Sequence, residues 1–113
     1  MDHPTIDDSL HLYSYWRSSA AYRVRIALAL KSLAFETRPV HLLKDGGQQH
    51  AAAYVQVNPQ QLVPVLLHGR RAIRQSLAII DWLDRAFPEP RLIPEDAMPR
   101  AVALAQAQVV ASD

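Results

Sequence analysis

Two adjacent serines, Ser18 and Ser19, stand where an apolar segment ends and a helical pattern begins. The first turn of a helix has unpaired backbone N–H groups, so these groups and the two hydroxyls would converge on one point. Arg17 and Arg23 add positive charge near the same corner. This combination suits an anion such as a phosphate, a carboxylate or a thiolate. Helix capping alone also explains the serines, and a solvated surface charge explains each arginine.

Gln75 and Ser76 mark a second corner of the same kind, at the start of a later helical pattern. Capping alone would again explain Ser76. Between the corners, Val63-Pro64 begins a predicted strand, where proline requires a cis peptide bond or an edge position. A cis bond would turn the N–H and C=O of Val63 into a groove, ready to pair with an extended peptide. The two corners and the proline could together hold one small peptide with a carboxylate at one end and a thiol in the middle.

The composition excludes several classes of partner. With 113 residues, half of them apolar, the chain is expected to form one domain with a modest core. The formal net charge is +1 and the charges are mixed, so no basic stripe indicates nucleic-acid binding. No apolar run approaches the roughly 18 residues of a membrane span, and residues 1–9 lack a signal-peptide pattern. The expected partner is a small molecule, and the expected compartment is the cytoplasm.

The chain contains no cysteine. Disulfides, thiolate metal sites and a protein thiol nucleophile are therefore excluded, so any sulfur chemistry must use a sulfur that a ligand brings. The histidines show no spacing typical of metal ligands, and no metal is expected. These histidines are His3, His11, His41, His50 and His68.

The hydrophobic pattern predicts alternating strands and helices. The expected strands are 10–15, 35–43, 63–67 and 72–73, and the expected helices are 19–33, 48–54 and 77–87. Ser76 is the expected N-cap of the third helix, and 68–71 is the expected loop of a hairpin. The first two strands are expected to be parallel because a helix connects them. The order β-α-β-α-β-β-α matches a thioredoxin-like α/β fold.

A linker and one more helix are expected after this domain. The expected division is a domain at 10–88, a proline-rich linker at 89–95, and the first helix of an all-α domain at 96–113. Val102, Ala105 and Val109 would form an apolar seam on this helix, with little sequence left to cover it. The seam could pack on the first domain, meet another subunit, or belong to a second domain that is largely absent here.

The chain from about Leu12 to Ile93 resembles the N-terminal domain of zeta-class glutathione transferases, whose best-known members are maleylacetoacetate isomerases. Four blocks in the same order carry the resemblance, and the first is the most specific. They are Tyr15-Trp16-Arg17-Ser18-Ser19 with Arg23-Val24-Arg25-Ile26-Ala27-Leu28, Lys44-Asp45-Gly46-Gly47-Gln48-Gln49, Asn58-Pro59 followed by Val63-Pro64, and Gln75-Ser76-Leu77-Ala78-Ile79-Ile80.

The resemblance implies that Ser18 holds the thiolate of glutathione as cofactor. Ser19 and the helix start at Ala20, Ala21 and Tyr22 would support it. Ala20 departs from a frequent family cysteine, which argues against an obligatory protein thiol. Tyr22 stands where tryptophan is common, a milder change that keeps an aromatic ring.

The resemblance also implies how the rest of the tripeptide is bound. Gln49, Val63, Pro64, Gln75 and Ser76 would hold it, with Val63 pairing to its backbone. Gln75 and Ser76 would take the γ-glutamyl end.

The implied activity is the glutathione-dependent cis-trans isomerisation of maleylacetoacetate to fumarylacetoacetate in aromatic amino-acid catabolism. Ser18, Ser19 and Arg23 are the expected catalytic residues, and Arg17 is the expected contact to the diacid substrate. A homodimer is expected. Maleylpyruvate isomerase and a general glutathione transferase or dehalogenase are alternatives within the enzymes. A non-catalytic glutathione-binding module or a truncated product is the alternative outside them.

Overall fold

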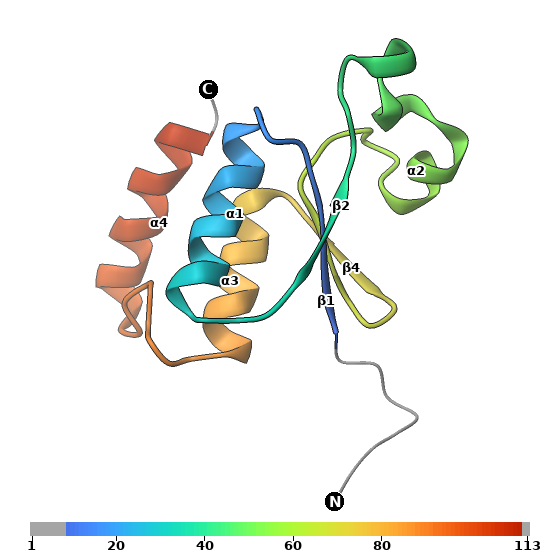
Figure 1. Ribbon diagram of the computed structural model, residues 1–113. Coiled ribbons are helices and arrows are strands. Elements are labelled where there is room, and N and C mark those ends of the chain that lie inside the picture. Colours follow the sequence, from blue (N-terminus) through green and yellow to red (C-terminus); the bar gives the residue numbers. More distant parts are fainter. Residues whose placement is uncertain (1–8, 112–113) are drawn as a thin grey trace, which may run out of the picture.

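The computed structural model describes residues 9–111 and contains one mixed sheet with helices on both faces (Figure 1). The strands are β1 Leu10–Ser14, β2 Glu36–Pro39, β3 Val65–His68 and β4 Arg71–Arg74. The α-helices are α1 Ser19–Leu30, α2 Ala52–Val57, α3 Ser76–Ala86 and α4 Ala97–Ala111. The strand order is β2-β1-β3-β4, with β1 and β2 parallel and the other two pairs antiparallel. The predicted order of elements along the chain, β-α-β-α-β-β-α, and the parallel pairing of the first two strands are confirmed.

Alternation along β1 sorts its side chains onto the two faces of the sheet. Leu10 and Leu12 are buried in the core that α1 and α3 cover. Tyr13 points to the other face, where its ring lies 5.4 Å from that of Tyr54 on α2. Figure 1 shows α1 and α3 together on one side of the sheet and α2 on the other. The larger core cluster consists of Leu10, Leu12, Val24, Ala27, Leu28, Leu66, Ile79 and Leu83.

Helix α1 ends at Leu30, before the predicted boundary at 33. Ser32 adopts a left-handed φ of 54°, and the N–H of Leu33 donates to the C=O of Leu28 at 3.0 Å. This bond has the pattern of a Schellman end, which satisfies a terminal carbonyl and stops the helix. Hydrophobic periodicity alone extended the helix too far, because the stop uses a serine where glycine is the usual signal.

The second strand is shorter than predicted, because β2 ends at Pro39 and not at 43. Two 3-10 turns follow it, at Lys44–Gly46 and Gln48–His50. The strand ends early because both backbone groups of His41 bond to Gln48 within the loop, at 2.8 Å each, and not to a neighbouring strand. The predicted helix at 48–54 is correspondingly displaced to α2.

Two details around the hairpin also differ from the sequence prediction. The turn between β3 and β4 is shorter than the expected loop at 68–71, because the ladder continues to the pair His68 and Arg71. Ser76 is the first helical residue of α3 and not its N-cap. Gln75 takes the N-cap position with a φ of 74° and makes no side-chain capping bond. The Ser76 hydroxyl is therefore available for other contacts.

Helix α4 packs on the domain through a face other than the predicted seam. Val102 and Val109 of that seam are 50% and 70% exposed, respectively. Another side of α4 lines an apolar groove of about 460 Å³ against α1 and α3. Figure 1 shows α4 on the outer side of these two helices. The residues of α4 that line the groove are Ala103, Leu104, Ala107 and Val110.

A buried lysine joins the end of α1 to the end of α3. The Nζ atom of Lys31 donates to Oδ1 of Asp84 at 3.0 Å, to the C=O of Phe87 at 2.6 Å and to the C=O of Pro90 at 2.7 Å. An ammonium group has three protons, so all of its donors are used. Both side chains of the ion pair are fully buried.

Asp84 extends this contact to the segment before α4. Its carboxylate accepts the backbone N–H groups of Leu92 at 2.7 Å and Ile93 at 3.1 Å. Burial raises the pKa of Asp84, but these two bonds and Lys31 outweigh it, so the pKa lies below its ordinary value. One carboxylate therefore fixes α1, α3 and the segment that leads to α4.

Candidate functional site

Ser18 is the N-cap of α1, with φ −77° and ψ 117°. Its Oγ accepts the backbone N–H of Ala21 at 3.1 Å. A hydroxyl has one proton and two acceptor lone pairs, so this bond leaves the proton of Ser18 free to donate to an anion. Capping and anion binding are thus compatible roles for the same hydroxyl, and the cap holds the oxygen in place.

The other predicted residues of this corner lie in different surroundings. Ser19 is exposed at the first helical position, and Ala20 lines a small cavity beside it. Ala21 is fully buried in the protein. Tyr22 is 56% exposed, and its ring lies under the guanidinium of Arg25 at 5.3 Å. The structure therefore brings Ala20 to the cavity and leaves Ala21 and Tyr22 outside it.

Arg17 is exposed beyond the end of β1 and does not line the cavity. Its guanidinium lies 4.6 Å from the ring centroid of Trp16, which is itself 67% exposed. A stacked guanidinium keeps its edge donors available. Arg17 can therefore meet an anion that approaches this end of the sheet from solvent.

The cavity beside Ala20 joins Arg23 of the first turns of α1 to the second corner at Gln75 and Ser76, whereas Ser18 and Ser19 do not line it. It has a volume of about 230 Å³, below the roughly 300–1,000 Å³ of most small-molecule sites, so it suits one end of a ligand. Figure 1 shows α1 and α3 starting at the same end of the molecule. The peptide bond between Val63 and Pro64 is cis, which was one of the two alternatives. The lining residues are Ala20, Arg23, Asn58, Leu62, Val63, Pro64, Gln75, Ser76 and Ala111.

Arg23 supplies the positive charge of this cavity. Its Nη2 donates to Oγ of Ser76 at 3.5 Å, which is a long bond. Its Nε is buried and has no hydrogen-bond partner within residues 9–111. A buried Nε with an unused proton favours a bound anion, because an unpaired buried donor is costly. The Ser76 hydroxyl, 7% exposed, retains its proton for the same ligand.

The two predicted glutamines lie apart from each other. Gln75 is exposed, and its Nε2 donates to Oε1 of Gln60 at 2.8 Å. Gln49 does not line the cavity. Its Oε1 is buried in the loop after β2 and has no partner among the described residues. Gln49 therefore does not line the cavity, but its Oε1 is an unused hydrogen-bond acceptor.

Asn58 is a site residue that the sequence interpretation missed. It is 1% exposed, donates through Nδ2 to the C=O of Leu62 at 3.0 Å and accepts the N–H of Gln60 through Oδ1 at 3.0 Å. These bonds hold the loop that carries Val63. In the sequence, Asn58-Pro59 indicated a helix end and formed part of one block of the resemblance, but no role in the site was assigned to Asn58.

Tyr54 supports the same loop, because its hydroxyl donates to the C=O of Leu62 at 2.5 Å.

Burial raises the pKa of Tyr54 to about 12. The unfolded chain loses this proton near pH 10, so stability that is complete below about pH 10 is lost as the pH rises toward 12. Urea unfolding is expected to show that the free energy of unfolding falls above pH 10 in the unsubstituted protein and falls less in Tyr54→Phe. An equal fall of the free energy of unfolding in the two proteins above pH 10 would contradict this.

The family model for the glutathione S-transferase N-terminal domain matches residues 12–91. The chain is 54% identical over 105 residues to a probable maleylacetoacetate isomerase of Vibrio cholerae, covering 93% of this chain and 49% of the relative. The chain thus spans about half the length of the curated relatives it matches.

Two solved structures are similar in fold and sequence. A holo maleylpyruvate isomerase, described as a bacterial zeta-class transferase, has a TM-score of 0.81 at 44% identity, over 88% of this chain and 46% of its own. Maleylacetoacetate isomerase from Anaeromyxobacter dehalogenans, with glutathione bound in its active site, has a TM-score of 0.75 at 49% identity, over 92% of this chain and 49% of its own. The resemblance drawn from the sequence is confirmed, and the chain belongs to the glutathione S-transferase family as a zeta-class N-terminal domain.

Proposed function

We propose that this chain is the glutathione-binding part of a cis-trans isomerase that acts on maleylacetoacetate. The observation that carries the proposal is the cavity in which Nη2 of Arg23 donates to the Ser76 hydroxyl while its buried Nε has no partner within residues 9–111. Ala20, two positions after the Ser18 cap, lines the same cavity. The names of the relatives support the activity, and the glutathione in the Anaeromyxobacter enzyme supports the cofactor.

The residues fit the parts of glutathione. The γ-glutamyl carboxylate would enter the cavity and take donors from Arg23, Ser76 and Gln75. The backbone of Val63 would pair with the peptide in the middle of the ligand. Ser18 would donate its free hydroxyl proton to the thiolate, with Ser19 beside it.

Bound glutathione would supply a thiolate that adds to the cis double bond and leaves again after rotation about the resulting single bond. The role of this chain is to stabilise charge. Ser18 and the α1 N-terminus favour the thiolate over the thiol. Arg17, exposed on Trp16, would attract the carboxylates of the diacid from solvent.

The assembly and the compartment belong to the same proposal. A homodimer in the cytoplasm, with a role in tyrosine and phenylalanine catabolism, fits such an enzyme. No helix within residues 9–111 is long and apolar enough to cross a membrane. The division into a domain at 10–88, a linker at 89–95 and a helical part from 96 is also proposed, and its end at 112–113 lies outside the described residues.

A glutathione-binding module without catalysis is the second candidate. It is favoured by the apolar side chains left uncovered by the rest of residues 9–111, including Ile26 and Leu30 of α1 and Val110 of α4. A surface of this kind indicates a missing partner or segment. Such a partner would carry the part of the site that recognises the diacid.

Two measurements on one preparation separate these candidates. Glutathione binding is measured by calorimetry, and the isomerisation of maleylacetoacetate is measured with and without glutathione. Binding with glutathione-dependent turnover supports the isomerase, and binding without turnover supports the module. A chain that does not bind glutathione would refute both.

A further inference from the structure

His41, near the start of the loop that follows β2, forms several hydrogen bonds within that loop. Its Nδ1 accepts the backbone N–H of Leu43 at 3.2 Å and that of Lys44 at 2.9 Å. A backbone N–H can only donate, so Nδ1 carries no proton in this arrangement and the neutral ring is protonated on Nε2. The imidazole therefore serves as the acceptor that starts the first 3-10 turn.

The backbone of His41 closes the same loop from the other side. Its N–H donates to Oε1 of Gln48 at 2.8 Å, and its C=O accepts the N–H of Gln48 at 2.8 Å. These two bonds join His41 and Gln48, the first and last residues of the loop 41–48. Gln49, with its buried and unpartnered Oε1, comes directly after this closure.

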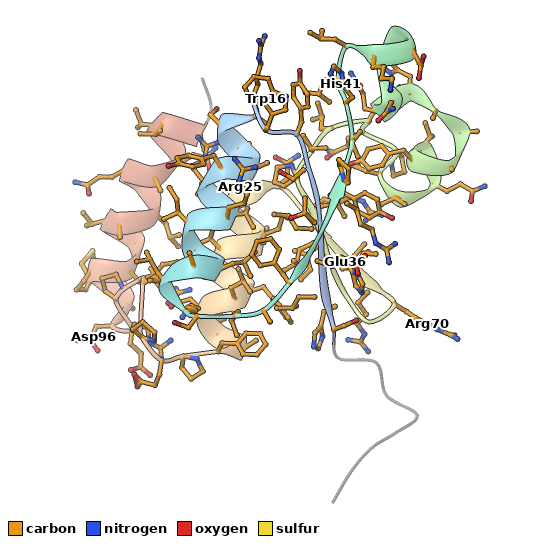
Figure 2. The ribbon with its side chains drawn as sticks, in the orientation of Figure 1. Trp16, Arg25, Glu36, His41, Arg70 and Asp96 are labelled. Atoms are coloured by element: carbon orange, nitrogen blue, oxygen red, sulfur yellow. The ribbon has the colours of Figure 1, made fainter. Side chains whose placement is uncertain are left out.

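His41 also ties the loop to the first corner of the site. Its ring centroid lies 4.9 Å from that of Tyr15, which is 7% exposed and stands between β1 and Ser18. Figure 2 shows His41 and Trp16 at the same end of the sheet, while Arg70 lies at the opposite end. His41 thus contacts the loop of Gln49 and the segment that leads to Ser18.

We propose that His41 is a positioning residue that holds Gln49 in place to bind glutathione. The inference rests on the proposed function, because it takes glutathione as the ligand of Gln49. His41 acts only while its Nδ1 is unprotonated. Protonation would replace the acceptor with a third donor facing two N–H groups, and the loop would open.

The groups around His41 do not offset this effect. Tyr15 packs against the ring from the β1 side, and Lys44 and Asp45 belong to the same loop. Within residues 9–111 no carboxylate forms an ion pair with His41. The ring with an unprotonated Nδ1 is therefore the form that holds the loop.

The test compares His41→Asn with His41→Leu. Asparagine can accept the N–H groups two and three residues on, as in an Asx turn, whereas leucine cannot. The Leu variant is expected to raise the Kd for glutathione about tenfold by calorimetry, because two hydrogen bonds are lost. The Asn variant is expected to keep the Kd within about twofold. Hydrogen exchange of the ligand-free Leu variant is expected to be faster at Leu43, Lys44 and Gln48.

His68→Asn is the matched control, because His68 lies at the far end of β3 and packs on Trp82. It should leave the Kd unchanged. If the unsubstituted protein binds glutathione and the Leu variant binds it equally well, the role of His41 is wrong while the proposed function stands. Equal losses in the Asn and Leu variants would also overturn it. If the unsubstituted protein does not bind glutathione, the proposed function itself fails, whereas the exchange result still reports on the loop.

Discussion

Replacing Asp84 with asparagine is expected to lower the free energy of unfolding by about 3–5 kcal/mol. The substitution keeps the size of the side chain but leaves the Lys31 ammonium buried without a counter-charge. It also weakens the acceptor that holds the N–H groups of Leu92 and Ile93. The whole stability of a domain is roughly 5–15 kcal/mol, so the loss is a large share. Urea unfolding followed by tryptophan fluorescence measures it.

Asp81→Asn is the matched control on the same helix, because Asp81 pairs with Arg85 and Arg100 nearer the surface. It is expected to cost about 1 kcal/mol or less. The pKa of Asp84 is lowered in the folded protein, so its stabilisation is complete above about pH 4 and is lost as the pH falls further. A cost for Asp84→Asn no greater than that for Asp81→Asn would contradict the structural role of this ion pair.

Replacing Ser18 with alanine is expected to reduce the isomerisation rate about ten- to a hundredfold. A hydrogen bond to a charged acceptor is worth about 1.5–3 kcal/mol, and each 1.36 kcal/mol changes a rate tenfold. The rate should fall because less of the bound glutathione is ionised. A free thiol with a pKa near 8.5 is only about 3% thiolate at pH 7. The pH profile of the rate is therefore expected to shift upward by about one to two units.

Ser18→Thr is the control, since it keeps the hydroxyl for both the cap and the thiolate. Alanine also removes the cap, which should cost about 1 kcal/mol of folding stability. Urea unfolding measures this separately from activity. A rate loss in Ser18→Ala without a shift of the pH profile would mean that the hydroxyl caps the helix and does not hold the thiolate.

The features predicted well from the sequence are local in the chain. Ser18 follows a strand and precedes a helix within a few residues, so cap preference and periodicity were enough to find the corner. The parallel pairing of the first two strands followed from the same reasoning, because a helical crossover between two strands favours it. The chemistry of the corner became specific only through the resemblance.

The features that were missed depend on contacts between distant segments. Lys31 and Asp84 are 53 positions apart, and single charges in a sequence do not reveal a buried partner. The sequence indicated the turn at 44–47, but it did not indicate that the backbone of His41 bonds to Gln48 or that its ring accepts the N–H groups of Leu43 and Lys44. The face of α4 that is buried was also set by packing on α1 and α3, not by its own apolar pattern.

The central claim is that glutathione binds where α1 and α3 begin, with its sulfur at Ser18. Titration of the isotope-labelled chain with reduced glutathione, followed by NMR, tests this directly. The account predicts shifts concentrated in the amides of Ser18, Ser19, Val63, Gln75 and Ser76. Absent shifts, or shifts confined to the apolar groove beneath α4, would contradict it.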